Sequence, residues 1–262
     1  MDLGVSGKVA IITGGSNGIG RAAAERLSAE GALVALVSRT QADLDQVAGE
    51  ISASSGNEVI GIATDVRDED AVKAMVEAVV AKWGRVDILV NNAGTALGAR
   101  FMDMTNEMVE QDFGLKVMGA VFCTRYALPH LVANKGAICN TTTPGGKAPG
   151  AGSQPTAMSR ASGISLTKTW ANEFAEQGVR VNTVCVGLLK SRQHKLRWEK
   201  SLEKNPDVTL EEQYERMGQN VPMGRVGEAS EAGDVIAFLC SERASYVTGT
   251  AVNIDGGNSP VV

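Results

Sequence analysis

The sequence predicts an α/β fold, a doubly wound parallel sheet of about seven strands with helices on both faces. Three observations predict it. Short apolar runs alternate with helix-like segments along the chain, a glycine-rich turn follows the first run, and polar residues stand where several later runs end. Since no polar or Pro/Gly-rich linker interrupts this alternation, residues 1–262 are expected to form one domain.

Composition limits the classes of function. The chain has 262 residues, 44 % of them apolar, and a net charge of −5. Because no basic stripe is present, nucleic acid is not an expected partner. The four cysteines are far apart without metal-ligand spacing, so we expect reduced core thiols and no metal site. No leader-like or membrane-length apolar segment stands out, so we expect a cytoplasmic protein without membrane association.

The glycine-rich turn predicts a dinucleotide site. The apolar run at 9–12 leads into the sequence TGGSNGIG, and a helix is expected directly after it. Gly14 permits a sharp turn, Gly18 lets the backbone approach a pyrophosphate, and Gly20 lets the helix pack closely on the strand. Free N–H groups at the start of the helix then face the anion. An ordinary tight turn is the alternative.

The end of the second predicted strand, at 32–37, indicates which dinucleotide is bound. Ser38, Arg39 and Thr40 follow it, about 20 residues after the glycines, where such folds contact the adenosine ribose. An acidic residue there would accept a hydrogen bond from the ribose 2′-hydroxyl. Arg39 instead suits a 2′-phosphate, so we expect NADP(H) in preference to NAD(H). A solvated arginine in a loop is the alternative.

A carboxylate follows the third predicted strand. A helix is expected at 41–54 and a strand at 59–63, after which come Asp65 and Val66. The carboxyl ends of parallel strands are where ligands of such sheets bind. Asp65 therefore either accepts a hydrogen bond from the adenine amine or caps the helix expected at 68–83.

Two amides follow the fourth predicted strand, at 86–90. The sequence there is Asn91-Asn92-Ala93-Gly94. The two side-chain amides can brace the sheet, and Ala93 and Gly94 leave room for a flat ring beside the strand end.

The second half continues the alternation with one interruption. Further elements are expected as a helix at 106–132, a strand at 136–141, a helix at 155–176, a strand at 179–186, a helix at 230–240 and a strand at 251–254. Residues 188–226 break this rhythm, because they are charged and contain a helical run at 209–217. An insertion of this size after the carboxyl end of a strand is typical of a substrate lid.

Two motifs, TGxxxGxG at 13–20 and NNAG at 91–94, are similar to the signature of the short-chain dehydrogenase/reductase family. The resemblance covers nearly the whole chain. It implies a Rossmann domain, a small-molecule substrate and a homodimer or homotetramer. The residues expected at the cofactor are Gly14, Ser16, Asn17, Gly18, Ile19, Ser38, Arg39, Thr40, Asp65, Val66, Asn92, Ala93, Gly94, Arg160, Gly187 and Leu189.

The resemblance also implies an unusual catalytic centre. Members of the family usually carry a serine, a Tyr-x-x-x-Lys pair and an asparagine on the buried helix. The corresponding positions here are Thr143 for the serine, Thr156 for the tyrosine, Arg160 for the lysine and Lys116 for the asparagine. None of the three tyrosines of the chain has a lysine four residues later. We therefore expect a divergent member that lacks the pair.

These exchanges differ in their chemical consequences. The hydroxyl of Thr156 is a far weaker acid than a phenol, whose pKa is about 10, and Arg160 keeps a positive charge without exchanging protons. Lys116 is the only charged residue between positions 113 and 124, and burial lowers the pKa of a lysine. We hypothesise that Lys116 replaces tyrosine as the proton donor. The alternatives for Lys116 are that it pairs with a carboxylate or holds water molecules. His194 is a weaker candidate for the proton donor, and the alternative for it is a solvated residue.

The function expected from the resemblance is hydride transfer between NADP(H) and a carbonyl or alcohol carbon, with Lys116, Thr143, Thr156 and Arg160 at the catalytic centre. Two alternatives stay open. In the first, the chain binds NADP(H) with little or no turnover and acts as a sensor or as a silent partner in an oligomer. In the second, it reduces a double bond and the proton comes from solvent.

Overall fold

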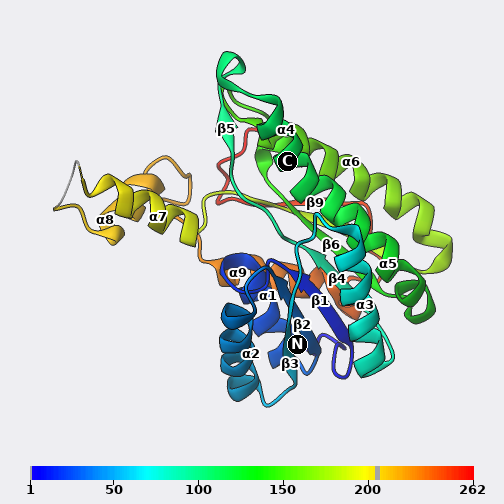
Figure 1. Cartoon of the computed structure of the whole chain (residues 1–262). Coiled ribbons are helices and arrows are strands. Elements are labelled where there is room, and N and C mark those ends of the chain that lie inside the picture. The colour runs from blue at the N-terminus through cyan, green and yellow to red at the C-terminus, as the bar shows by residue number, and fades with distance from the viewer. Residues whose placement is uncertain (1, 204–206) are drawn as a thin grey trace.

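A seven-stranded parallel sheet forms the centre of the computed structural model, which describes residues 2–203 and 207–262 (Figure 1). The strand order is β3-β2-β1-β4-β6-β8-β9. The strands are β1 (Val9–Thr13), β2 (Leu33–Ser38), β3 (Val59–Ala63), β4 (Ile88–Asn91), β6 (Ala137–Thr142), β8 (Arg180–Val186) and β9 (Ala251–Ile254). The predicted doubly wound fold is confirmed.

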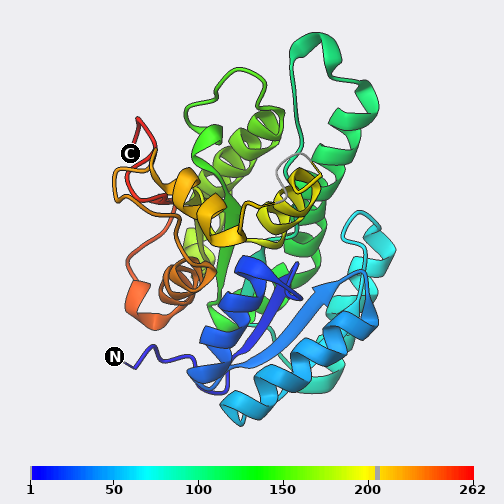
Figure 2. The same ribbon diagram turned by 90° about the vertical axis from the view of Figure 1, so that its left-hand side faces the viewer.

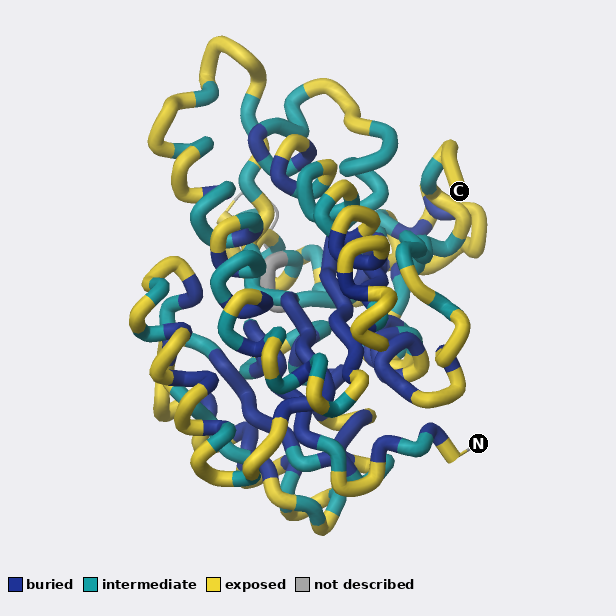
Figure 3. Tube along the Cα trace, turned by 90° about the vertical axis from the view of Figure 1, so that its right-hand side faces the viewer, coloured by how far each residue is buried: buried dark blue, intermediate teal, exposed yellow. Residues whose placement is uncertain are grey.

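Helices cover both faces of this sheet (Figure 1). One apolar cluster joins the sheet to α1 (Gly18–Ala29), α2 (Gln41–Ser55) and α9 (Ala229–Cys240). A second cluster joins the opposite face to α3 (Glu69–Trp83), α5 (Gly119–Asn134) and α6 (Thr156–Phe174). The central strands are therefore buried on both sides, and the exposed residues lie on the outer faces of the helices and in the loops (Figure 3).

The direction in which the chain builds the sheet reverses between β1 and β4. From β1 the chain adds β2 and β3 on one side, and from β4 it adds β6, β8 and β9 on the other. Crossovers leaving in opposite directions open a crevice at the carboxyl ends of these two strands. The glycine turn follows β1 and the NNAG sequence follows β4, so both motifs lie at this crevice.

The helix predicted at 106–132 is not one continuous α-helix, which corrects that prediction. It consists of α4 (Asn106–Phe113) and α5, joined by a π-helical turn at Gly114–Met118. A π-turn adds a residue to the helical repeat and changes the face on which the following side chains lie. Because the segment is nearly uncharged, its sequence periodicity does not reveal the turn, which contains Lys116.

Several short elements were not predicted. β5 (Gly98–Ala99) pairs antiparallel with β7 (Gln154–Pro155), so Pro155 precedes α6 and does not begin it. α7 (Arg192–Ser201) is a polar helix without apolar periodicity, and its N-cap is Ser191. Short 3-10 helices are η1 (Phe101–Asp103), η3 (Pro144–Gly146), η4 (Ala175–Gln177) and η5 (Glu242–Ala244).

The segment expected to form a lid projects from the body of the molecule (Figure 1) and faces the viewer in Figure 2. It contains α7 and α8 (Leu210–Gly218), the second of which confirms the helical run predicted at 209–217. Its base is closed by backbone pairing, in which Lys190 N donates to Gly227 O (2.8 Å) and Gly227 N donates to Leu188 O (3.0 Å). The segment therefore leaves and rejoins the fold at the carboxyl end of β8. Its action as a lid stays a prediction.

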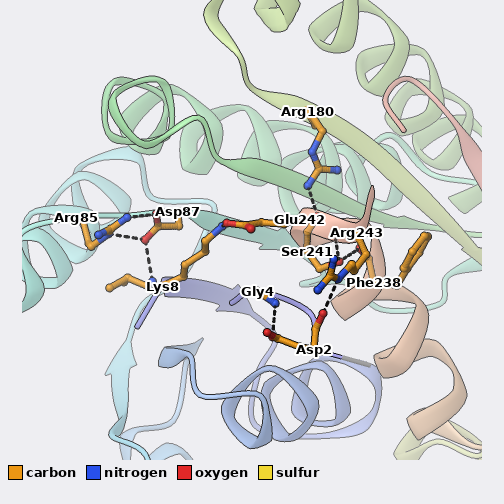
Figure 4. Close-up of polar contacts among 11 residues, drawn as sticks. Asp2, Gly4, Lys8, Arg85, Asp87, Arg180, Phe238, Ser241, Glu242 and Arg243 are labelled. Atoms are coloured by element: carbon orange, nitrogen blue, oxygen red, sulfur yellow. Dashed lines mark hydrogen bonds and ion pairs between the residues drawn. The ribbon is translucent and has the colours of Figure 1, made fainter. Parts of the chain in front are cut away.

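Ionic and polar contacts hold the opposite, amino-terminal edge of the sheet together (Figure 4). The carboxylate of Asp87, a residue only 2 % exposed, pairs with Arg85 and accepts a hydrogen bond from Val9 N at 2.9 Å. Arg180 donates from Nη1 to Leu239 O (2.7 Å) and from Nη2 to Ser241 O (2.9 Å). In the part of the chain that the structure describes, no helix has the length and apolar character needed to cross a membrane.

Candidate active site

The glycine turn has the backbone geometry that its sequence predicts. Gly14 and Gly18 have φ angles of +66° and +55°, in the left-handed region that glycine adopts without strain. A Cβ at Gly18 would meet nothing within 4 Å, so the chain there is open to an approaching ligand. A Cβ at Gly20 would lie 2.3 Å from Gly14 O, so a side chain at this position would clash with the turn. The turn is thus shaped for close approach of both a ligand and the strand.

The N-terminus of α1 opens toward the same crevice. Asn17 is the N-cap residue, but its side chain makes no capping hydrogen bond. The first N–H groups of a helix have no partner within the helix. They remain available to an anion beside Ser16 and Ile19, which are both partly exposed.

The two amides of the NNAG sequence brace the strands as predicted. Asn91 Nδ2 donates to Asn140 Oδ1 at 2.9 Å, which links β4 to β6. Asn92 Nδ2 donates to Thr13 O at 3.0 Å, which links the end of β4 to the end of β1. Ala93 and Gly94 continue along the crevice, where Ala93 N donates to Thr13 Oγ1 at 3.0 Å.

The residues expected at the adenosine end lie where β2 and β3 finish. Arg39 is exposed beside Ser38, and Thr40 is the N-cap of α2 without a side-chain capping bond. The Asp65 carboxylate binds the side chain of Arg67, with Nε 3.0 Å from Oδ1, and this hydrogen bond lowers the pKa of Asp65. The contact of Ser38, Arg39 and Thr40 with a cofactor stays a prediction.

Asp65 is not the helix cap, which corrects one of its two predicted roles. The N-cap of α3 is Asp68, whose carboxylate accepts a hydrogen bond from Ala71 N at 3.0 Å. Asp65 lies three residues earlier, and the neighbouring Val66 packs its side chain against Gly119 of α5, where a Cβ would lie 2.8 Å from Val66 Cγ2. The contact with adenine therefore stays a prediction for Asp65.

The buried Lys116 is at the centre of a polar cluster formed by two helices. Lys116 pairs with Asp112, four residues earlier, and both side chains are at most 1 % exposed. Lys116 Nζ also donates to Thr156 Oγ1 at 2.8 Å. Burial, followed by the charge of Arg160, lowers the pKa of Lys116 to about 8. The alternative that Lys116 pairs with a carboxylate is confirmed, and it does not exclude the proton-donor hypothesis.

The Thr156 hydroxyl makes three hydrogen bonds. It accepts hydrogen bonds from Lys116 Nζ and from Leu97 N (3.1 Å), and it donates to Asp112 Oδ1 at 3.2 Å. Ser159, one turn along α6, donates to Asp112 Oδ2 at 2.5 Å. The hydrogen of Thr156 is thus directed at a carboxylate, and its oxygen holds the lysine ammonium in place.

The side chain of Arg160 extends from α6 to the carboxyl end of β6. Its Nη1 donates to Thr141 O at 2.6 Å. Its Nη2 lies next to Gly94, where a Cβ would be only 2.8 Å away. Burial lowers the pKa of Arg160 to about 10, against the opposing effect of Asp112. Arg160 therefore stays charged at neutral pH and brings that charge to the carboxyl ends of β4 and β6.

Three buried polar atoms around Arg160 have no hydrogen-bond partner in residues 2–203 and 207–262: Arg160 Nε, Asn91 Oδ1 and Thr141 Oγ1. All three residues line one small cavity of about 20 Å³, together with Lys116 and Ser159. A cavity of this size has room for about one water molecule, which needs two to four polar partners. The polar lining matches that requirement.

The other predicted site residues lie around this edge of the sheet. Thr143, partly exposed, follows β6 at the start of η3, which packs against α6. Gly187 follows β8, where a Cβ would lie 2.5 Å from Asp255 Cβ, so the position accepts only glycine without rearrangement. The side chain of Leu189 belongs to the apolar core and is 5 % exposed. The contact of Leu189 with a cofactor stays a prediction.

His194 is not the solvated residue suggested as the alternative to a donor. It is partly buried on α7, and its Nδ1 is 2.9 Å from Leu189 O. Burial lowers the pKa of His194. Its ring therefore contacts the base of the projecting segment, and its role as a weaker candidate donor stays a prediction.

Two residues of the cluster were missed in the sequence. Asp112 precedes Lys116 by one helical repeat, a spacing at which opposite charges pair on a helix, and this signal was available. Ser159 carries no comparable signal, because its contact with Asp112 spans 47 positions along the chain.

Comparison with known proteins places this geometry in a family. A family model described as enoyl-(acyl carrier protein) reductase matches residues 14–259. The chain is 33 % identical to meso-2,3-butanediol dehydrogenase of Serratia marcescens, over 95 % of this chain and 94 % of the relative. It is 35 % identical to 3-oxoacyl-(acyl-carrier-protein) reductase FabG of Thermotoga maritima, over 97 % and 98 % of the two chains.

Solved structures agree over the full length. L-sorbose reductase from Gluconobacter frateurii, complexed with NADPH and L-sorbose, matches with a TM-score of 0.95 at 34 % identity and covers 100 % of both chains. An NADPH-bound short-chain oxidoreductase from Pseudomonas aeruginosa PAO1, described as containing an atypical catalytic center, matches with a TM-score of 0.91 at 32 % identity and covers 99 % of both. With this fold and these relatives, the chain belongs to the short-chain dehydrogenase/reductase family.

Proposed function

We propose that this protein is an NADP(H)-dependent oxidoreductase that transfers hydride between the cofactor and a carbonyl or alcohol carbon of a small molecule, through an atypical active site. The observation that carries the proposal is the convergence of Lys116, Thr156 and Arg160 at the carboxyl edge of the sheet, beside the crevice of the glycine turn. Family membership supports the reaction class, and the residues of the cluster support its unusual chemistry.

The residues present fit a dinucleotide phosphate. The open backbone at Gly18 and the uncapped start of α1 suit a pyrophosphate, and the exposed Arg39 suits a 2′-phosphate. Two NADPH-bound relatives support the same cofactor. We expect Arg39→Ala to reduce the NADPH affinity about tenfold to a hundredfold, as for loss of a charged hydrogen bond, while NADH affinity stays unchanged. Equal losses for both nucleotides in fluorescence titrations would contradict the NADP(H) preference.

Each residue of the cluster has a distinct task in the proposed reaction. When bound, NADPH supplies a hydride, with its electron pair, to the carbonyl carbon. The Lys116 ammonium donates the proton that the carbonyl oxygen then takes up, which leaves an alcohol and a neutral amine that recovers a proton from solvent. Thr156 holds the ammonium, Thr143 orients the substrate oxygen, and Arg160 meets the ribose. Oxidation of an alcohol reverses these transfers.

The test is the Lys116→Met variant, compared with Lys73→Met on the exposed surface of α3. We expect NADPH binding to persist in both variants, because Lys116 acts on the proton. Reduction of ketones, followed as NADPH oxidation, should fall by about 10²- to 10⁴-fold in Lys116→Met alone, the usual contribution of general acid catalysis. Equal turnover in the two variants at every pH would refute the role of Lys116.

A second candidate function is cofactor binding with little turnover. The observation that favours it is the Thr156 hydroxyl, whose hydrogen is directed at Asp112 and is therefore not directed at a substrate. NADPH oxidation screened against ketones, quinones and enoyl compounds separates the two functions. Turnover of any of these classes contradicts the silent protein, and turnover confined to enoyl compounds would instead favour reduction of a double bond.

We also propose that the chain acts as a homodimer or homotetramer in the cell. The support is its resemblance to the family, whose members commonly assemble through the helical segment that corresponds to residues 106–132. Light scattering of the purified chain measures the assembly directly, and a monomer at micromolar concentration would contradict the proposal.

A further inference from the structure

Asp112 is the acidic partner of the Lys116 cluster and is fully enclosed. Its side chain has no exposed surface. Lys116, Thr156 and Ser159 together occupy its carboxylate, each contacting one of the two oxygens. Oδ1 faces the Lys116 ammonium and the Thr156 hydroxyl, and Oδ2 accepts the hydrogen bond from Ser159 at 2.5 Å. Hydrogen bonds from two hydroxyls and one ammonium thus fix the orientation of the carboxylate.

Stability by itself is a weak reason for this ion pair. Removing two charges from water costs several kcal/mol, and an apolar pair of the same volume is often as stable. The pair also joins α4 to a residue inside the π-turn, which is itself a departure from the regular helix. A charged pair retained at such a place points to a function of the charge.

Charge balance suggests what that function is. Lys116 and Arg160 bring two positive charges to the same cavity, one from the π-turn and one from α6. The groups that face Lys116 from the packed elements are Asp112 on α4 and Arg160, Thr156 and Ser159 on α6, with the thiol of Cys185 on β8 interacting with Arg160. Asp112 therefore supplies the negative charge that opposes both burial and Arg160.

We propose that Asp112 is a positioning residue that keeps Lys116 protonated and aims its ammonium toward Thr156, so that the lysine is ready to donate a proton. This inference rests on the proposed function, because it concerns the donor of that reaction. Asp112 contacts Lys116 and the two hydroxyls directly and acts on the substrate through them. Ser159, in turn, holds the carboxylate oxygen that the lysine does not use.

The first test measures Lys116 without any substrate. Protein labelled with ¹³C-lysine gives a titration curve for the Lys116 Cε resonance, which is assigned by its loss in Lys116→Met. In Asp112→Asn we expect the pKa of Lys116 to fall by roughly 1–3 pH units, the usual effect of an adjacent opposite charge. The control, Glu110→Gln, removes an exposed carboxylate from the same helix and should leave the pKa unchanged. A folded Asp112→Asn protein with an unchanged Lys116 pKa would overturn the inference.

A second variant keeps the test decisive if Asp112→Asn does not fold. Asp112→Glu retains the charge and moves it by one methylene, so the pKa of Lys116 and the pH midpoint of NADPH oxidation should shift together. A merely structural role of Asp112 would lower the melting temperature and leave both pH values unchanged, which would also overturn the inference.

The pH profile separates this inference from the proposed function. In Asp112→Asn the midpoint for ketone reduction should fall by the same amount as the pKa of Lys116. If the pKa falls and the rate profile does not, Lys116 is not the donor, and the proposed roles of Lys116 and Asp112 fail together while the measured ketone reduction still supports the oxidoreductase. If the pH midpoint of NADPH oxidation equals the pKa of Lys116 but Asp112→Asn changes neither value, the proposed function stands and the inference on Asp112 fails.

Discussion

The two edges of the sheet use the same kinds of residue in opposite ways. At the amino-terminal edge, the Asp87 carboxylate accepts hydrogen bonds from Val9 N and the Arg85 side chain, and Arg180 donates to backbone carbonyls. At the carboxyl-terminal edge, the buried atoms Arg160 Nε, Asn91 Oδ1 and Thr141 Oγ1 have no partner among the described residues. Since an unpaired buried polar group costs free energy, a protein retains such groups where a ligand, a water or a reaction uses them.

This difference teaches which substitutions should alter stability and which should alter function. A change at the amino-terminal edge breaks bonds that the folded chain makes with itself, so it should lower the free energy of unfolding. A change at the carboxyl-terminal edge removes groups that serve a bound molecule, so it should alter binding or turnover. Four predictions, in order of decreasing expected effect, test this division.

Gly20→Ala should have the largest effect of these four, on cofactor affinity at the carboxyl-terminal edge. The new Cβ would lie 2.3 Å from Gly14 O, so the turn and α1 must move apart. Overpacking of this kind costs about 1–3 kcal/mol, and we expect NADPH affinity to fall by up to about a hundredfold. Gly49→Ala on α2 is the control, because its Cβ would meet nothing within 4 Å. Titration of NADPH fluorescence measures both, and equal affinities would contradict the assigned role of the turn.

The rate of ketone reduction should depend on pH through Lys116. The reaction consumes the protonated lysine, whose pKa is lowered to about 8 by burial. We therefore expect kcat/KM for reduction to be level below pH 8 and to fall about tenfold for each pH unit above it. Alcohol oxidation should show the opposite dependence, because it needs the neutral amine. Steady-state rates from pH 6 to 10 measure this, and parallel profiles in the two directions would speak against the lysine.

Asp87→Ala should affect the amino-terminal edge through stability. The substitution leaves the buried Val9 N–H without its acceptor, which costs about 1–3 kcal/mol. Glu242→Ala is the control, because its pair with Lys8 is exposed and such pairs contribute at most about 1 kcal/mol. Urea unfolding measures the difference. NADPH affinity should be unchanged in both variants, and a selective loss of affinity in Asp87→Ala would break the division between the edges.

Two buried threonines give the smallest and most direct comparison. The Thr183 hydroxyl donates to Asn140 O at 2.7 Å, whereas the Thr141 hydroxyl has no partner in the described chain. Thr183→Val should lower the free energy of unfolding by about 1 kcal/mol, and Thr141→Val should be nearly neutral. Equal losses in denaturant unfolding would show that Thr141 is bound within the protein after all.

Much of the fold is evident from local sequence. Each apolar run of the sheet is bounded by turn residues. Gly14 and Gly18 have positive φ angles, which glycine adopts more readily than any other residue. The order of the strands in the sheet was not predicted, because local sequence does not say which strands pair, and it is given by the structure alone. The π-turn and α7 were missed, since a mostly apolar segment and a mostly polar one show little periodicity.

The candidate site was predictable in part. The sequence pointed to Lys116, Thr156 and Arg160 as exchanged positions, and the structure brings them to one cavity or into direct contact. The contact between Leu189 and a cofactor stays a prediction, because the structure shows only that this side chain packs in the apolar core. Asp112 was overlooked, although its spacing from Lys116 allowed the pair to be recognised.

The sequence by itself determined the alternation of strands and helices, the glycine conformations and the absence of a Tyr-x-x-x-Lys match among its tyrosines. These are properties of neighbouring residues, so local physical chemistry is sufficient to predict them. Only the tertiary structure decided that Asp112 meets Thr156 and Ser159, 44 and 47 positions away on α6, and that Lys116 meets Thr156, 40 positions away. The physical reason is burial: packing α4 and α6 together removes these groups from water, and their charges and hydrogen bonds must then be satisfied by one another.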